Sequence, residues 1–403
     1  MHSWARDAAG RHARVVAILA TVLALSGITP SAHADIRSRQ WHLDAMRAEE
    51  IWQISKGKGI TVAVVDTGVE SSLANLEGRV LEGKSFSEAP GNAHTDPNNH
   101  GTLIAEMIAG TGAGDNNAFG LAPGATILPL RVANGSDSPN AASAERAFSS
   151  QVSAAIRYAA DSQARIINVS MGSQASDEQL AQAVQYALSK GKIIFASVGN
   201  SGNAENDVEY PAALPGVIGV AAVNREIRAT EESQYGPQVD LAAPGEDMVS
   251  VCANGTDICT SHGTSDATAL ASASAALVWS AHPDWTANQV LRVLINTAGG
   301  PKSGEKRSDS LGYGVVRPRI ALQNPGDPGP PDVSPLPELA AAPAAKPSAG
   351  TKATAADDNG SGTGPLSTRT TVIAAAVTAV ALAVAVPTLI TRRRRRKPLP
   401  GQG

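Results

Sequence analysis

The chain contains only two cysteines in 403 residues, Cys252 and Cys259, and it contains no internal repeat. No second pair of ligand residues stands at a suitable spacing, which argues against a zinc site. The two cysteines are therefore either free thiols or partners in a small disulfide loop. A Leu-Pro-x-Thr-Gly motif is also absent before the apolar run at 371–391, and this argues against a cell-wall sorting signal.

Residues 1–34 have the three parts of a secretory signal peptide. Arginines precede an apolar run from Val15 to Leu25, and Ala32-His33-Ala34 forms a small-x-small cleavage site. The apolar run is short for an uncleaved membrane anchor. Because exported proteins keep disulfides, a bond between Cys252 and Cys259 is expected rather than free thiols.

The other end of the chain predicts a membrane anchor. Residues 371–391 carry no charge and are numerous enough to span a bilayer, and a basic tail follows at 392–403. The positive-inside tendency predicts a single-pass cell-membrane protein with this tail in the cytoplasm and the preceding chain outside. A basic run alone can indicate nucleic-acid binding, but beside a membrane span we expect no nucleic-acid partner. Residues 324–370 are rich in Pro, Ala, Gly and Ser, which predicts a linker without a core.

Three short segments supply an acid, an imidazole and a hydroxyl in the order Asp, His, Ser. Asp66 follows the apolar run 59–65, which is typical of a buried strand in a parallel sheet. His100 and Ser265 each open a helical pattern. At a helix N-terminus, free backbone N–H groups favour a developing oxyanion. This order is one of those that build a Ser-His-Asp triad.

A fourth segment, residues 193–203, is an apolar strand pattern that ends in a polar, glycine-rich turn. Asn200 in that turn can donate its side-chain amide to an oxyanion. Helical and apolar stretches alternate along the chain, which predicts an α/β fold, a mostly parallel central sheet with helices on both faces. The alternating stretches are 141–160 before 165–169, and 177–190 before 193–197.

On these segments the chain resembles subtilisin-like serine proteases over residues 40–322. It is most similar to the membrane-anchored mycosin type associated with type VII secretion. The resemblance implies a peptidase domain at 59–323 preceded by an N-terminal arm at 35–58. It also implies that Asp66 orients the imidazole, His100 is the general base, Ser265 the nucleophile and Asn200 the oxyanion donor. The segment Ser170-Met171-Gly172 resembles the substrate-binding strand beside the primary specificity pocket.

The sequence departs from the family pattern at three positions. Asp266 follows the nucleophile, where it is either a first-turn acid favoured by the helix dipole or a carboxylate that opposes the oxyanion. Ala269 stands where the family usually has proline. Glu106 replaces a usual glycine on the helix of His100, which predicts either wider helix packing or a solvent-facing turn.

These observations predict a membrane-anchored extracellular serine endopeptidase that acts on peptide or protein substrates through an acyl-enzyme. The alternative is a weakly active or inactive tethered scaffold of a secretion complex, with type VII secretion machinery as its partner.

No cofactor is expected. The oxygen-rich stretch Asp115-Asn116-Asn117 suits either calcium or an ordinary polar turn. The net charge of the whole chain is −4, and the net charge of its middle part is more negative than this because basic segments lie at both ends. Such acidity serves either basic substrates or solubility.

Overall fold

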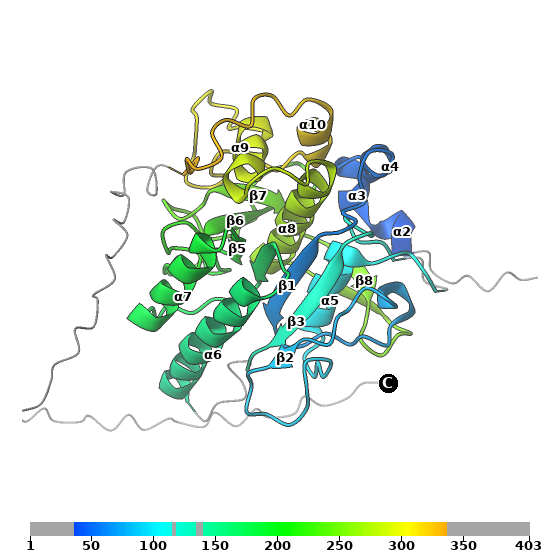
Figure 1. The fold of residues 1–403 in the computed structure, drawn as a ribbon, viewed down its shortest axis with the longest axis vertical. Helices are drawn as coiled ribbons and strands as arrows, with labels where there is room; N and C mark the ends of the chain where they lie inside the picture. Colours follow the sequence, from blue (N-terminus) through cyan, green and yellow to red (C-terminus); the bar gives the residue numbers. More distant parts are fainter. Residues whose placement is uncertain (1–35, 115–117, 134–139, 337–403) are drawn as a thin grey trace, which may run out of the picture. The chain divides into compact units, whose positions relative to one another are not determined.

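The computed structural model describes residues 36–114, 118–133 and 140–336 (Figure 1). The predicted signal peptide and the expected span at 371–391 lie outside these ranges, as does the candidate calcium stretch 115–117. Within the described ranges, no helix combines the length and apolarity needed to cross a bilayer.

Among the described residues, seven strands form one parallel sheet in the order β2-β3-β1-β4-β5-β6-β7. This sheet confirms the predicted α/β fold. Each central strand is short, apolar and buried, as expected for a sheet covered on both faces. The strands are β1 Thr61–Asp66, β2 Lys84–Ser85, β3 Thr126–Arg131, β4 Ile166–Val169, β5 Ile193–Ser197, β6 Ile218–Val223 and β7 Leu241–Pro244.

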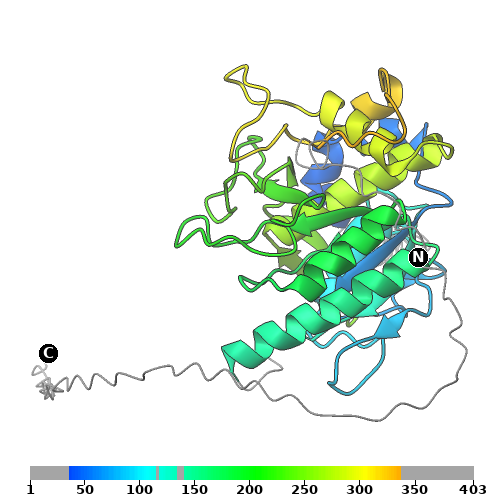
Figure 2. The ribbon, with the colours of Figure 1, turned by 60° about the vertical axis from the view of Figure 1, so that its left-hand side comes forward.

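Two helical layers cover the sheet, because alternate side chains of each strand point to opposite faces. Val62 and Val64 of β1 belong to the core beneath α5 His100–Ala109 and α8 Thr264–Ala281. The intervening β1 residues belong to the core beneath the second layer. That layer is α6 Ala141–Asp161 and α7 Glu178–Ser189, which lie side by side in both views (Figure 2).

Helix α8 lies in the centre of the molecule, with every residue from Thr264 to Trp279 buried. Its many Ala and Ser side chains allow the close approach to β4, β5, β6 and β7. An antiparallel hairpin, β8 Met248–Val251 and β9 Ile258–Ser261, leads directly into this helix. The cysteines join within the hairpin as a disulfide, with Cα atoms 5.1 Å apart.

Three short helices precede β1 and are tied to the domain by side-chain hydrogen bonds. They are α2 Ile36–Arg39, α3 Trp41–Ala45 and α4 Ala48–Trp52. Trp41 Nε1 donates to the carbonyl of Glu246 at 2.9 Å, and Trp52 Nε1 donates to the carbonyl of Leu121 at 2.9 Å. The remaining elements are the 3-10 turn η1 Ala74–Leu76, α9 Ala287–Thr297 and α10 Pro318–Gln323.

Residues 324–336 differ from the expectation that the chain leaves the core at 324. Arg292 of α9 donates to the carbonyls of Pro328 and Pro330, and Leu336 is buried. A proline-rich segment has many free carbonyls, so one guanidinium can hold it without a regular element. The packed domain therefore continues beyond the predicted boundary.

Candidate active site

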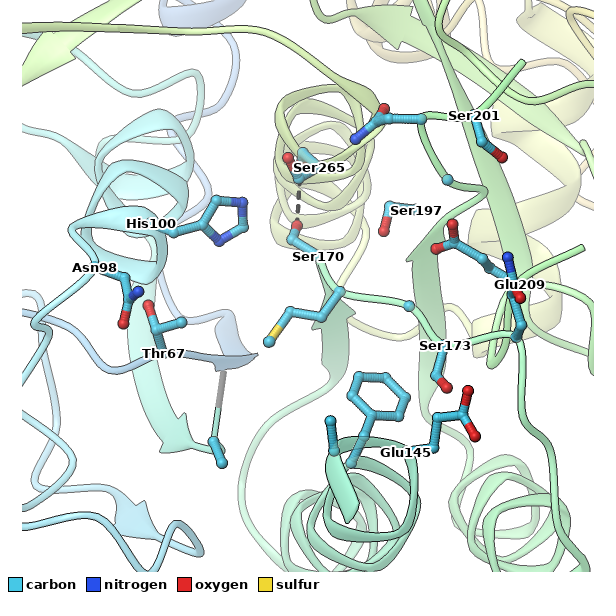
Figure 3. Close-up of a pocket in the computed structure, with 18 of the residues that line it drawn as sticks. Thr67, Asn98, His100, Glu145, Ser170, Ser173, Ser197, Ser201, Glu209 and Ser265 are labelled. Carbon is cyan, nitrogen blue, oxygen red and sulfur yellow. Dashed lines mark hydrogen bonds between the residues drawn. The ribbon is translucent and has the colours of Figure 1, made fainter. Parts of the chain in front are cut away.

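A cleft of about 750 Å³ opens at the carboxyl ends of the central strands (Figure 3). His100, Ser265 and Asn200 all line it, although they come from segments far apart in the chain. In Figure 3 the His100 ring and Ser265 lie on opposite sides of the cleft, at the same end of it. The structure thus brings together three of the four residues predicted for catalysis in one cavity, and the fourth, Asp66, lies behind His100.

Asp66 is fully buried at the end of β1, and its Oδ1 lies 2.7 Å from Nδ1 of His100. The same oxygen accepts the backbone N–H of Thr67 at 2.7 Å. The negative charge of Asp66 is the largest influence on His100 and raises the pKa of His100 to about 9. Because Nδ1 donates to the carboxylate, Nε2 is the ring nitrogen available to Ser265.

Asp96 forms hydrogen bonds with residues close to Asp66 and His100 in the chain, and the sequence patterns did not single it out. Its Oδ1 accepts Thr67 Oγ1 at 2.7 Å, and its Oδ2 accepts the backbone N–H of Thr102 at 2.8 Å. The second contact satisfies an N–H in the first turn of α5, which begins at His100. An acid four residues ahead of a predicted helix start is the signal that could have indicated it.

Ser265 lies in the first turn of α8, and its backbone is fixed from β4. Ser170 Oγ donates to the carbonyl of Ser265 at 3.0 Å, and Asn168 Nδ2 donates to Ser170 Oγ at 2.9 Å. The Ser170 hydroxyl is therefore occupied by the helix, whereas Met171 and Gly172 border the open cleft. The Ser265 N–H belongs to a first helical turn, where N–H groups have no partner within the helix.

Asn200 orients the start of the same helix through its amide oxygen. Oδ1 accepts the backbone N–H of Thr264 at 2.9 Å and Thr264 Oγ1 at 3.1 Å. This arrangement leaves Nδ2, the donor atom, for the cleft. The side-chain amide of Asn200 and the N–H of Ser265 are the two donor groups predicted to bind an oxyanion.

Asp266 is buried rather than held at the surface of the first turn. Its Oδ1 accepts Ser261 Oγ of β9 at 3.1 Å, and its Oδ2 has no hydrogen-bond partner among the described residues. Burial raises the pKa of Asp266 to about 7, while the charges of His100 and His262 oppose that rise. Its charge in turn helps to raise the pKa of His100.

Glu106 contradicts the expectation of a solvent-facing turn, since the residue is only 1% exposed. Asn75 Nδ2 donates to its Oε1 at 2.6 Å, and Ser250 Oγ of β8 donates to its Oε2 at 2.7 Å. These two partners make burial tolerable, although desolvation still raises the pKa of Glu106 to about 8.

Two further carboxylates, Glu145 and Glu209, line the cleft, and sequence reasoning singled out neither. Figure 3 shows Glu209 beside Ser197 and Ser201, and Glu145 at the opposite end from Ser265. Within the part of the chain that the structure describes, no cluster of three or more His, Cys, Asp or Glu residues could hold a metal ion.

Comparison with known proteins identifies the family of the chain. The family model described as "Subtilase family" matches residues 57–314. Thermitase of Thermoactinomyces vulgaris is 34% identical over 261 residues, which are 65% of this chain and 88% of thermitase. The crystal structure of MycP1 from Mycobacterium smegmatis has a TM-score of 0.66 at 28% identity, covering 75% of this chain and 89% of MycP1. The MycP3 protease from the type VII (ESX-3) secretion system has a TM-score of 0.60 at 31% identity, covering 74% and 90% of the two chains.

Proposed function

We propose that this chain, which belongs to the subtilase family of serine proteases, is a membrane-anchored endopeptidase acting through Ser265, His100 and Asp66. The observation that carries the proposal is the 2.7 Å contact between Asp66 and His100. The His100 ring lies across the cleft from Ser265, which is in the first turn of α8 (Figure 3). A pure scaffold has no need for a buried carboxylate that orients an imidazole.

The first half of the reaction is acylation. His100 Nε2 takes the proton of Ser265 Oγ as that oxygen attacks the peptide carbonyl. Asp66 holds Nδ1–H, which fixes the tautomer and offsets the charge of the imidazolium. His100 then gives the proton to the leaving amine, and the acyl group remains on Ser265.

The second half is deacylation, in which water takes the place of the amine. His100 takes a proton from the water as the water attacks the ester, and returns a proton to Ser265 Oγ. In both halves the carbonyl oxygen becomes an oxyanion. Asn200 Nδ2 and the Ser265 N–H donate to it, and Thr264 keeps Asn200 in position through its N–H.

The expected location follows from the sequence of the two ends. A signal peptide at 1–34 and a span at 371–391 followed by a basic tail would hold the catalytic domain outside the cell membrane. The similarity to MycP1 and MycP3 supports a type VII secretion apparatus as the physiological partner, because MycP3 is a protease from the type VII (ESX-3) secretion system.

Labelling with a fluorophosphonate probe tests the catalytic assignment. The full chain should be labelled, the Ser265→Ala chain should not, and both should unfold at the same temperature. Labelling of Ser265→Ala at the rate of the parent would refute Ser265 as the nucleophile.

A tethered scaffold with little activity is the second candidate, and Asp266 is the observation that favours it. A buried carboxyl next to the nucleophile, with one oxygen unpartnered, can oppose a developing oxyanion when it ionises. Under this alternative the parent chain is unlabelled and Asp266→Ala regains labelling. Absence of labelling in every folded form would leave the scaffold as the function.

A further inference from the structure

Glu209 occupies a specific place in the cleft, between the two chain segments that follow β4 and β5. A Cβ atom added at Gly172 would overlap Oε2 of Glu209, and one added at Gly199 would overlap Oε1. Both segments therefore present bare backbone to this carboxyl. Glycine at each position lets the carboxylate lie against the backbone of both segments, and we call the part of the cleft that they border together the slot.

The carboxylate of Glu209 lacks a cationic partner. Its single hydrogen bond among the described residues comes from Gln234 Nε2, 3.0 Å from Oε1. None of the ion pairs found in the described ranges includes Glu209, and no Lys or Arg is among the described residues that line the cleft. Partial burial raises the pKa of Glu209, since no positive charge compensates for the lost water. Oε2 therefore remains available to a cation that enters from the cleft.

The position of Glu209 relative to the proposed catalytic residues indicates which residue of the substrate contacts the Glu209 side chain. His100 protonates the leaving amine, so the leaving side of the substrate lies on the His100 side of Ser265. The acyl side lies on the other side, where Asn200 receives the oxyanion. Glu209 is on that acyl side, beside Ser197 and Ser201 in Figure 3. The residue whose carbonyl is attacked thus directs its side chain toward Glu209.

We infer that Glu209 determines specificity by binding a lysine or arginine side chain at the residue on the acyl side of the cleaved bond. The straight aliphatic stem of such a residue fits between the two glycine-bearing segments, and its charged end reaches the carboxylate. A charge-assisted hydrogen bond in a partly desolvated slot is stronger than a neutral one. The inference adds the substrate class to the proposed function and rests on it for the cleavage assay.

Two peptides that differ only in arginine or citrulline at this position test the inference, because citrulline keeps the shape and removes the charge. With the full chain, we expect the arginine peptide to have a kcat/KM higher by about tenfold or more. In Glu209→Gln the ratio should fall to about one, mainly through slower cleavage of the arginine peptide.

Binding to the full-length Ser265→Ala chain, measured by fluorescence anisotropy, tests the same preference without catalysis. The arginine peptide should bind more tightly than the citrulline peptide, and Ser265→Ala with Glu209→Gln should lose that difference. If neither peptide is cleaved by the parent but the binding preference holds, the proposed activity fails and the slot stands. If cleavage occurs without a preference, the inference about Glu209 fails and the protease stands.

Glu145→Gln is the matched control, since it removes one carboxylate from the same cleft at the end away from Ser265. It should leave the ratio of the two peptides close to that of the parent, because an exposed charge far from the bound side chain is screened by salt. Equal loss of the ratio in Glu145→Gln and Glu209→Gln would overturn a specific role for Glu209. The melting temperature shows that each variant is folded, and fluorophosphonate labelling is an added check for the variants that keep Ser265.

Discussion

Asn99, the residue before His100, donates from its Nδ2 to Sγ of Cys259 at 3.2 Å. Its Oδ1 also accepts the backbone N–H of Ala253, inside the loop that the disulfide closes. Asn99 is held in the left-handed region at a φ of 62°, immediately before α5. The hairpin β8–β9 is therefore bonded to the segment that carries the imidazole and leads directly into the helix that carries Ser265.

Replacing both cysteines by serine should weaken this connection. Closing so short a loop in the unfolded chain contributes about 2 kcal/mol to stability by the chain-entropy argument. We expect the double variant to unfold at a lower urea concentration and to react more slowly with the fluorophosphonate, because Asn99 loses its sulfur partner. Urea titration and labelling rates measure the two effects. A variant with reduced stability but the parent's labelling rate would show that the hairpin does not position His100.

Glu106→Gln should stabilise the protein at alkaline pH. The pKa of Glu106 is about 8 in the fold against an ordinary value of 4.5, since burial favours the neutral carboxyl. Stability from that preference is complete below about pH 4.5, declines as pH rises and is lost above about pH 8. Glutamine keeps the shape and cannot ionise, so its advantage grows over this range to several kcal/mol at most.

Urea unfolding at about pH 5 and at about pH 9 measures this effect, because most of the ionisation of Glu106 takes place between these two pH values. Glu178→Gln on the exposed start of α7 is the control and should show the same small difference at both values. If Glu106→Gln differed from the parent equally at both pH values, the buried carboxyl would not be the titrating group.

The grouping of Asp66, His100 and Ser265 could be predicted from the sequence because each of them stands in a short local pattern. Asp66 ends an apolar strand, and His100 and Ser265 open helices, so the parallel sheet alone gathers them at one edge. The partners of Glu106 could not be predicted in this way. Asn75 and Ser250 lie 31 and 144 residues away and reach the carboxyl only through tertiary packing. A buried glutamate and an exposed glutamate can stand in the same local sequence pattern, so the sequence alone does not distinguish them.

The pH profile of hydrolysis should report His100. Catalysis needs the neutral imidazole, so kcat/KM should rise with pH as His100 loses its proton, with a midpoint near the pKa of about 9. Asp266 ionises near its own pKa of about 7 and then favours the protonated imidazole. Asp266→Asn removes that charge, and the midpoint should move to lower pH.

The rate at about pH 8 should therefore increase about threefold in Asp266→Asn, as expected for a shift of roughly half a pKa unit. Below about pH 6 Asp266 is already neutral in the parent, so the two profiles should converge there. Glu178→Gln, outside the cleft, should leave the midpoint in place. A midpoint that rises in Asp266→Asn would mean that Asp266 does not act on His100 through its charge.

Asn200 offers a test that separates donation to the oxyanion from support of the helix. Asn200→Ala removes both the Nδ2 donor and the Oδ1 acceptor that holds Thr264. Asn200→Asp keeps an acceptor for the Thr264 N–H, removes the donor and adds negative charge where the oxyanion forms. If donation matters, both variants should lose about 10²-fold to 10³-fold in kcat, the cost of removing one such donor in subtilisin, with little change in KM.

The comparison between the two variants decides the role. Asn200→Asp should be at least as slow as Asn200→Ala, because its charge repels the oxyanion, even though it keeps the contact with α8. If Asn200 served only to fix the helix, Asn200→Asp would retain most of the parent's kcat and only Asn200→Ala would fall. Peptide hydrolysis at fixed pH, with active sites counted by fluorophosphonate titration, distinguishes these results and corrects for any misfolded fraction.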